Sequence, residues 1–273
     1  MGFLTTRVVA VSDYLAERVR HGLPAEDFHV SGHAVLVIDG VGGFQFAPAL
    51  VQRALRLEGS SRNILMFRWQ TAVVGDIWTD LCWHRRNRLM AARLARGLRA
   101  WRRRNPHGRL DVVAFSAGAA IAVFACEQLR GRPFVETMVL ACPALSRKYN
   151  LGPALRAVRR CIALISRRDR FLLGAGTRLF GTVDRRFEPA AGLRGFALPD
   201  AVPPEDRAAY ARLREIWWDP SLHVLGHHGG HTGWGRVSFL RKHLLAMLDG
   251  APHLPTHPVF GLEPAHDASR DET

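Results

Sequence analysis

Residues 110–124 of the chain read LDVVAFSAGAAIAVF. The apolar run Leu110–Phe115 predicts a buried strand, and the alanine-rich run after it predicts a helix. A serine that attacks a carbonyl group must stand on a tight strand-to-helix turn, where backbone N–H groups can hold the developing oxyanion. Ala114 and Gly118, two places before and after the serine, are small enough for the strand and helix backbones to approach. The stretch therefore predicts that Ser116 is a nucleophile.

A simpler interpretation of Ser116 is a helix N-cap, because serine often satisfies the free N–H groups at the start of a helix. The motif alone does not decide between a cap and a nucleophile. Its place at the end of the third strong strand candidate of the chain favours the nucleophile.

Apolar runs of strand length alternate with helix-like stretches on both sides of this segment, which predicts an α/β fold. The runs lack polar alternation, so we expect both faces of a mostly parallel sheet of about six strands to be covered by helices. The expected strands are Ala34–Asp39, Ile64–Trp69, Leu110–Phe115, Thr137–Ala141, Cys161–Ser166 and the weaker Leu213–Trp218. The expected helices are Pro48–Arg56, Leu81–Arg104, Ala117–Arg130, Leu151–Arg160 and Val237–Leu248.

The chain has 273 residues, of which 48% are hydrophobic and 23% are charged, as in an ordinary globular protein. We expect one domain over residues 1–250 and a flexible tail over residues 251–273, which is rich in Pro, His, Asp and Glu. No apolar run reaches the roughly 20 residues that span a bilayer, and the first residues lack the apolar core of a signal peptide. These observations predict a cytoplasmic protein without a transmembrane segment.

The formal net charge is +14, and nearly all of the positive charge comes from arginine. The densest block, residues 84–104, carries apolar residues at helical spacing on one face: Leu89, Met90, Leu94, Leu98 and Trp101. One interpretation is a patch for nucleic acid or anionic lipid. Packing against a sheet already explains the apolar stripe, so we expect the arginines to form a solvated outer face and expect no nucleic-acid partner.

The cysteines do not form a CxxC pair, and three of them fall in segments that we expect to be buried strand or helix. They are Cys82, Cys126, Cys142 and Cys161. This distribution predicts reduced, packed thiols, without a disulfide framework or a zinc site. His227 and His231 have the four-residue spacing of metal ligands on a helix, but two glycines between them oppose a helix. We therefore expect no bound metal.

The chain resembles the α/β-hydrolase superfamily, and its AFSAG segment around Ser116 is a variant of the G-x-S-x-G motif of that superfamily. The blocks SRRDR (166–170), FGTVDRRF (180–187) and GHHGGHTGW (226–234) resemble a bacterial branch of it. The resemblance covers roughly residues 33–250. It implies an α/β-hydrolase fold with a reduced N-terminal part and no large cap, a Ser–acid–His order and hydrolysis, but no particular substrate.

In this superfamily the acid follows a later strand and the histidine precedes the last helix. Asp169 follows the strand candidate Cys161–Ser166, where a carboxylate can orient an imidazole and stabilise its cationic form. A surface aspartate paired with the arginines around it is the alternative interpretation. Asp184 is a second candidate for the acid, although no strand candidate precedes it.

The histidine must come from residues 221–234, which contain His223, His227, His228 and His231. The Gly229–Gly230 pair gives the backbone freedom to fold over the serine immediately before His231. The resembling proteins carry a similar G-G-H-T block. We therefore expect His231 to be the general base, with His228 as the alternative.

A glycine-rich turn follows the first strong strand candidate, from Asp39 to Gln45. By resemblance, the oxyanion donors are the backbone amides of Val41, Gly42 and Ala117. A dinucleotide-binding turn is the competing interpretation, but Gln45 occupies the place of the third glycine of G-x-G-x-x-G. We therefore expect no bound cofactor.

The loops Gln70–Thr79, Phe171–Phe180 and Trp217–His228 supply large apolar side chains for a pocket: Trp78, Phe171, Leu172, Trp217 and Trp218. Such a pocket suits an acyl or alkyl group. The predicted function is a serine hydrolase that cleaves a small-molecule carboxylic ester or thioester through Ser116, Asp169 and His231. The alternative is a non-catalytic scaffold of the same fold that binds a ligand or a partner.

Overall fold

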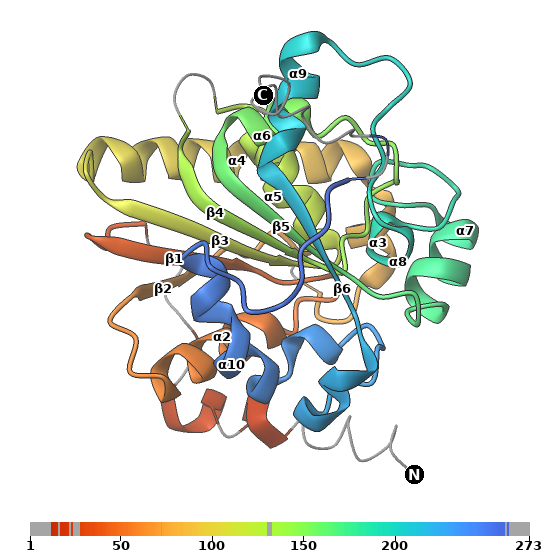
Figure 1. The fold of residues 1–273 in the computed structure, drawn as a ribbon. Coiled ribbons are helices and arrows are strands. Elements are labelled where there is room, and N and C mark those ends of the chain that lie inside the picture. Colours follow the sequence, from red (N-terminus) through yellow and green to blue (C-terminus); the bar gives the residue numbers. More distant parts are fainter. Residues whose placement is uncertain are drawn as a thin grey trace, which may run out of the picture.

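The computed structural model describes residues 12–15, 17–21, 23, 28–71, 73–129, 133–259 and 261. Its centre is a six-stranded sheet in which all neighbouring strands are parallel, in the order β2-β1-β3-β4-β5-β6 (Figure 1). The strands are β1 (His33–Ile38), β2 (Asn63–Met66), β3 (Arg109–Phe115), β4 (Val135–Ala141), β5 (Val158–Ile165) and β6 (Leu213–Trp217). The fold class predicted from the sequence is therefore confirmed.

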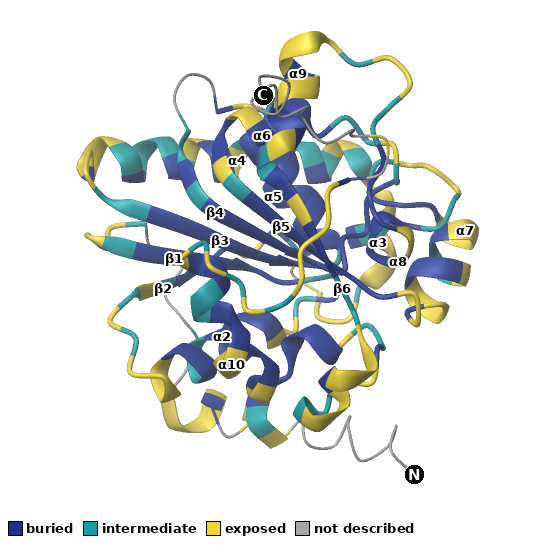
Figure 2. Ribbon diagram, viewed as in Figure 1, coloured by how far each residue is buried: buried dark blue, intermediate teal, exposed yellow. Residues whose placement is uncertain are grey.

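Helices cover both faces of this sheet, as an apolar parallel sheet requires. On one face α2 (Phe46–Leu57) packs against α10 (Val237–Leu248), and on the other α4 (His84–Arg104) packs against α5 (Ala117–Cys126) (Figure 1). The central strands are buried along almost their whole length (Figure 2).

Short helices gather at the edge where the carboxyl ends of the parallel strands meet, which is where open α/β sheets bind ligands (Figure 1). They include α3 (Ile77–Cys82), the π-helix η1 (Phe171–Gly176), α7 (Thr177–Phe180) and α8 (Ala191–Arg194). Helices α6 (Gly152–Arg156), α9 (Pro204–Ala209) and the 3-10 helix η2 (Tyr210–Arg212) lie before the amino ends of β5 and β6 instead. Two further 3-10 helices, η3 (Pro220–Leu225) and η4 (Gly233–Gly235), lie between β6 and α10. The connection between β4 and β5, residues 142–157, contains only α6, so no cap stands there.

Three helices differ from the predicted boundaries. The predicted helix Leu81–Arg104 is broken at Trp83, where α3 ends and α4 begins. The predicted helix Leu151–Arg160 is wrong in its second half, because Val158 and its neighbours pair with β4 as part of β5. The helix predicted to reach Arg130 ends at Cys126 in a turn, and Arg130 itself lies outside the described residues.

The arginine-rich helix α4 buries an apolar face and exposes much of its basic face, as expected. Leu94, Leu98 and Trp101 of the predicted stripe are buried. Leu89 is not part of this face, because 65% of its surface is exposed. Arg88 forms an ion pair with Glu127 across the contact with α5, at 2.5 Å.

Part of the predicted tail packs on the domain. The backbone of His257 pairs with that of Glu215 in β6, and Val259 is buried. Residues 262–273, which make up most of the rest of that tail, lie outside the described part of the chain. Among the described helices, none has the length and apolar character needed to cross a membrane.

Candidate active site

Ser116 stands on the sharp turn between β3 and α5, at the carboxyl edge of the sheet. Its backbone has φ 52° and ψ −121°, a left-handed value that costs a non-glycine residue on the order of 1–3 kcal/mol. Backbone hydrogen bonds hold it there: the N–H of Ser116 donates to Ala141 O at 2.8 Å, and its carbonyl accepts from the N–H of Ala144 at 3.1 Å. The surrounding sheet therefore imposes the strained turn.

Gly118 shows why the turn needs a small residue two places after the serine. A Cβ atom at this position would lie 2.3 Å from the carbonyl oxygen of Asp39. The helix therefore starts in direct contact with the end of β1. Ala114, two places before Ser116, is fully buried in β3.

His231 and Asp169 meet at the same edge of the sheet. Nδ1 of His231 lies 2.5 Å from Oδ2 of Asp169, which follows β5 and is 3% exposed. The loop that carries the histidine is tied to the end of β5, because Ser166 Oγ donates to Gly229 O at 2.6 Å. The two predicted partners are thus brought together by side chains and backbone from two distant parts of the sequence.

The charge state of His231 follows from this pairing. Burial disfavours the imidazolium, but electrostatic interactions with Cys142 and Asp169, and hydrogen bonds to both, outweigh it and raise the pKa of His231 well above 6.5. A carboxylate on Nδ1 also fixes the tautomer that leaves Nε2 free to accept a proton.

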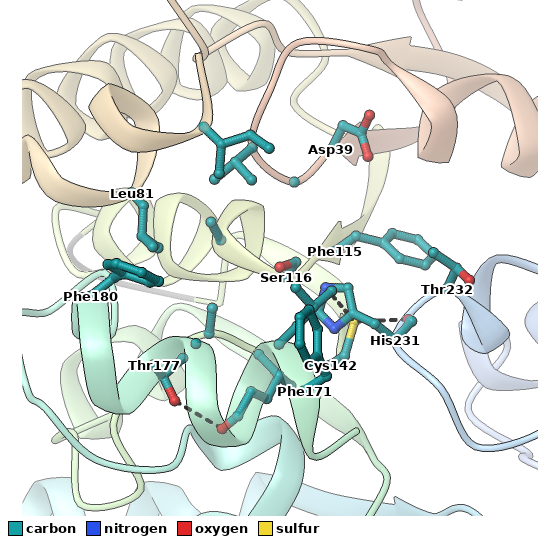
Figure 3. Close-up of a pocket in the computed structure, with 18 of the residues that line it drawn as sticks. Asp39, Leu81, Phe115, Ser116, Cys142, Phe171, Thr177, Phe180, His231 and Thr232 are labelled. Atoms are coloured by element: carbon teal, nitrogen blue, oxygen red, sulfur yellow. Dashed lines mark hydrogen bonds between the residues drawn. The ribbon is translucent and has the colours of Figure 1, made fainter. Parts of the chain in front are cut away.

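Cys142 also contacts His231, which the sequence analysis missed. Its Sγ lies 3.9 Å from Nε2 of His231 and donates to the carbonyl oxygen of His231 at 3.6 Å. Ser116 and Cys142 line the same cavity as this imidazole (Figure 3). The hydroxyl of Ser116 forms no hydrogen bond with any residue that the structure describes, so Nε2 faces the thiol here. The position of Cys142 directly after a central strand was the available sequence signal.

The alternative histidines and acid have other surroundings. His228 is exposed, and its ring packs on that of His223 at 4.8 Å. His227 is fully buried against Trp234, and burial lowers its pKa to about 3. Asp184 accepts hydrogen bonds from the backbone N–H and hydroxyl of Ser146, at 2.8 and 2.5 Å. The described side chains include no cluster of three metal-ligating groups.

The glycine-rich loop after β1 lies against Ser116. A Cβ at Gly40 would be only 3.3 Å from the Cβ of Ser116. Among the described contacts, the backbone N–H groups of Val41 and Ala117 donate to no protein acceptor, and both residues line the cavity. The N–H of Gly42, the third predicted donor, is already used, because it donates to Oδ2 of Asp80 at 2.8 Å. This geometry leaves two free donors.

The side chains of Gln70 and Asp80 fix the conformation of this loop. The Nε2 of Gln70 donates to the carbonyl oxygen of Gly40 at 2.5 Å, and Asp80 is the fully buried acceptor for Gly42. Because a trans peptide is planar, holding the Gly40 carbonyl on one side points the N–H of Val41 to the other. Asp39 accepts from the N–H of Ala47, and burial raises the pKa of Asp39 to about 6.

The cavity at this edge has a volume of about 700 Å³ and an almost entirely apolar lining. Trp78, Phe171 and Leu172 line it, as predicted. Trp217 and Trp218 do not. Trp217 stacks with Arg167, whereas the indole N–H of Trp218 donates to the carbonyl oxygen of His227. Both tryptophans are therefore used in packing beside the site.

The chain matches no known family model, and a search of curated proteins found no match. Several solved structures resemble it weakly. The esterase Pf2001 of Pyrococcus furiosus is 16% identical over 77% of this chain and 84% of the esterase, with a TM-score of 0.41. A cutinase-like protein from Cryptococcus sp. is 14% identical over 80% of this chain and 95% of its own, with a TM-score of 0.36.

A puromycin-hydrolysing peptidase of Mycobacterium tuberculosis is 12% identical, with a TM-score of 0.43. The match covers 84% of this chain but only 35% of the peptidase. At TM-scores below 0.5, none of these similarities assigns an activity to this chain, and any function must be argued from the site itself.

Proposed function

We propose that the protein is a serine hydrolase that cleaves small-molecule carboxylic esters or thioesters. Ser116 is the nucleophile, His231 the general base, and Asp169 the residue that orients the imidazole. One observation carries the proposal: a serine held in a strained strand-to-helix turn shares a cavity with a histidine whose Nδ1 is held by a buried carboxylate. The order serine, acid, histidine along the chain also agrees with it.

The reaction proceeds in two halves. Neutral His231 takes the proton of the Ser116 hydroxyl as the oxygen attacks the substrate carbonyl, for which Oγ and Nε2 must come within about 3 Å. The N–H groups of Val41 and Ala117 stabilise the oxyanion that forms. His231 then gives the proton to the departing alcohol or thiol. In the second half the same imidazole activates the water that releases the acid from Ser116.

The cavity favours a substrate with an apolar acyl or alkyl group. Of the described side chains that line it, only those of Asp39, Cys142 and His231 are titratable, and His231 is the one assigned to proton transfer. A charged substrate group would lose its hydration without gaining a partner deeper in the cavity. Small neutral esters are therefore the suitable first substrates.

Labelling with a fluorophosphonate probe tests the proposal directly, together with hydrolysis of p-nitrophenyl butyrate. We expect covalent attachment at Ser116 and turnover of the ester. A protein that is folded but neither labelled nor active would instead support the scaffold hypothesis, in which the same cavity only binds a ligand.

Replacing Cys142 by alanine is expected to move the acid limb of the kcat/KM profile to lower pH. His231 acts as a base only when neutral, and its raised pKa keeps it protonated up to a higher pH. Because the sulfur beside Nε2 is one cause of the raised pKa, its removal should lower the pKa of His231. The raised pKa of His231 also adds to the free energy of unfolding. This contribution is fully present below about pH 6.5 and is lost as the pH rises through the pKa of His231 in the folded protein. Cys82→Ala, at an exposed position, should leave the pH–rate profile unchanged. An unshifted limb in Cys142→Ala would contradict this account.

Gln70→Leu is expected to lower kcat by about tenfold to a hundredfold with little change in KM. The variant removes the donor that holds the Gly40 carbonyl, so the N–H of Val41 loses its fixed direction, and a lost oxyanion donor typically costs a hundredfold or more. Gln128→Leu is the matched control, because the side-chain amide of Gln128 donates to the carbonyl oxygen of Phe124, at the end of the same helix and away from the loop. Equal losses in both variants would show a general effect on folding.

A further inference from the structure

Six large apolar side chains are exposed around the mouth of the cavity, although they also line it. We call them the apolar rim: Ile77, Trp78, Phe171, Leu172, Leu179 and Phe180, with exposed fractions between 36% and 83%. Soluble proteins seldom leave a contiguous cluster of this kind in water unless it binds something. The rim is therefore a candidate binding surface.

The rim comes from two separate segments, which a ring contact joins. Trp78 of α3 and Phe180 of α7 meet edge to face, with ring centroids 4.3 Å apart. Phe171 begins η1, in the connection after β5, and is the most exposed of the six, at 83%. Helix α7 is drawn largely in yellow, as exposed, at the same edge of the sheet as α3 (Figure 2). The two segments thus form one projecting apolar surface rather than scattered side chains.

The segment after β5, which supplies four of the six rim residues, is positively charged. It carries four exposed arginines, Arg167, Arg168, Arg170 and Arg178, of which the first two stack on Trp217 and Trp218. On the other segment, the partly exposed Asp76 directly precedes Ile77. The one carboxylate within residues 166–180 is Asp169, which is buried and contacts His231. Apolar side chains that project from a cationic border are the features that anchor a protein surface in the interface of an anionic membrane.

We infer that the apolar rim docks on an anionic lipid surface, with its apolar side chains at the acyl boundary and the arginines at the headgroups. In this orientation the cavity opens toward the membrane, so an apolar molecule enters from the bilayer without crossing water. The docking depends on the rim and its arginines and not on Ser116. Binding can therefore be measured whether or not the protein proves to be a hydrolase.

Vesicle cosedimentation tests the inference, using phosphatidylcholine alone and an equal mixture of phosphatidylcholine and phosphatidylglycerol. We expect the full chain to bind the mixed vesicles and to lose that binding in high salt. Phe171→Ser should weaken binding by about tenfold, because the variant lacks one large apolar side chain whose transfer from water to the membrane favours binding. Arg178→Glu should weaken it by about fivefold or more on the mixed vesicles. Arg178 does not line the cavity but Phe171 does, so vesicle binding and not turnover is the quantity compared between the variants.

Leu89→Ser is the matched control, since Leu89 is 65% exposed on α4 but lies outside the rim. Retained binding in this variant, together with losses in Phe171→Ser and Arg178→Glu, supports docking through the rim. No binding by the wild-type chain, or equal losses in all three variants, would overturn the inference. If the chain ignores vesicles but forms dimers that Phe171→Ser disrupts, the rim is a self-interface and the lipid assignment is wrong.

Discussion

Ser116→Ala is expected to lower the turnover of p-nitrophenyl butyrate by on the order of a millionfold, the size of effect seen when a triad nucleophile is removed. The remaining groups cannot form the covalent intermediate, so only the free N–H donors and the binding cavity act on the substrate. Fold stability should change little, because the hydroxyl forms no hydrogen bond with described residues and alanine meets the same strained backbone. Single-turnover assays with the ester, and thermal unfolding, give the two measurements.

The control for this variant is Ser221→Ala, at an exposed position in the first turn of η3 that does not line the cavity. It should retain full activity and remain labelled by the fluorophosphonate. Activity of Ser116→Ala within tenfold of wild type would remove Ser116 from the mechanism, and persistent labelling would assign the reactive group to another residue.

Asp169→Asn is expected to lower kcat by about ten thousandfold while the chain stays folded. The amide can replace the carboxylate sterically, but it can donate to Nδ1 and thereby favour the tautomer whose Nε2 carries the proton. That imidazole cannot take the proton of Ser116. The variant also removes a negative charge 2.5 Å from the ring, so the pKa of His231 should fall.

Two measurements separate this positioning role from a purely structural one. Nuclear magnetic resonance titration of His231 should show the lower pKa in Asp169→Asn, and thermal unfolding should show a cooperative transition. Asp200→Asn, in an exposed ion pair with Lys148 at 2.7 Å, is the matched control and should alter neither turnover nor the titration. An Asp169→Asn enzyme with near-normal kcat would shift the role of the acid to another carboxylate.

Most of the sheet could be predicted because its strands are continuous apolar runs. The predicted and observed strands differ by three residues or fewer at each end, since burial on both faces leaves a strong local pattern. The early start of β5 at Val158, within the predicted helix Leu151–Arg160, has a long-range cause. Arg159 and Arg160 look like helix residues in isolation, but their partner Glu136 lies on the neighbouring strand.

The site could be predicted only where one segment carries its own signal. The turn at Ser116 is local, and its small neighbours are visible in the sequence. The contact between Cys142 and His231 is not visible, because it depends on how two loops from distant strands meet. The same applies to Asp80. Its carboxylate, on a helix nearly forty residues later, accepts the hydrogen bond of the Gly42 N–H. The position of Trp217 and Trp218 in a loop beside the site predicts that they line the cavity, but the structure places both in packing contacts instead.

The separation between the sheet edge and the cavity walls has an evolutionary consequence. The N–H of Ser116 donates to the last residue of β4 and that of Asp169 donates to Ser166 after β5, whereas Trp78, Phe171 and Leu179 stand exposed on short helices in two connections. Substitutions at such exposed positions usually alter the free energy of unfolding by no more than about 0.5 kcal/mol. Mutations in the walls can therefore change what the cavity binds without unfolding the chain and without disturbing the strained turn.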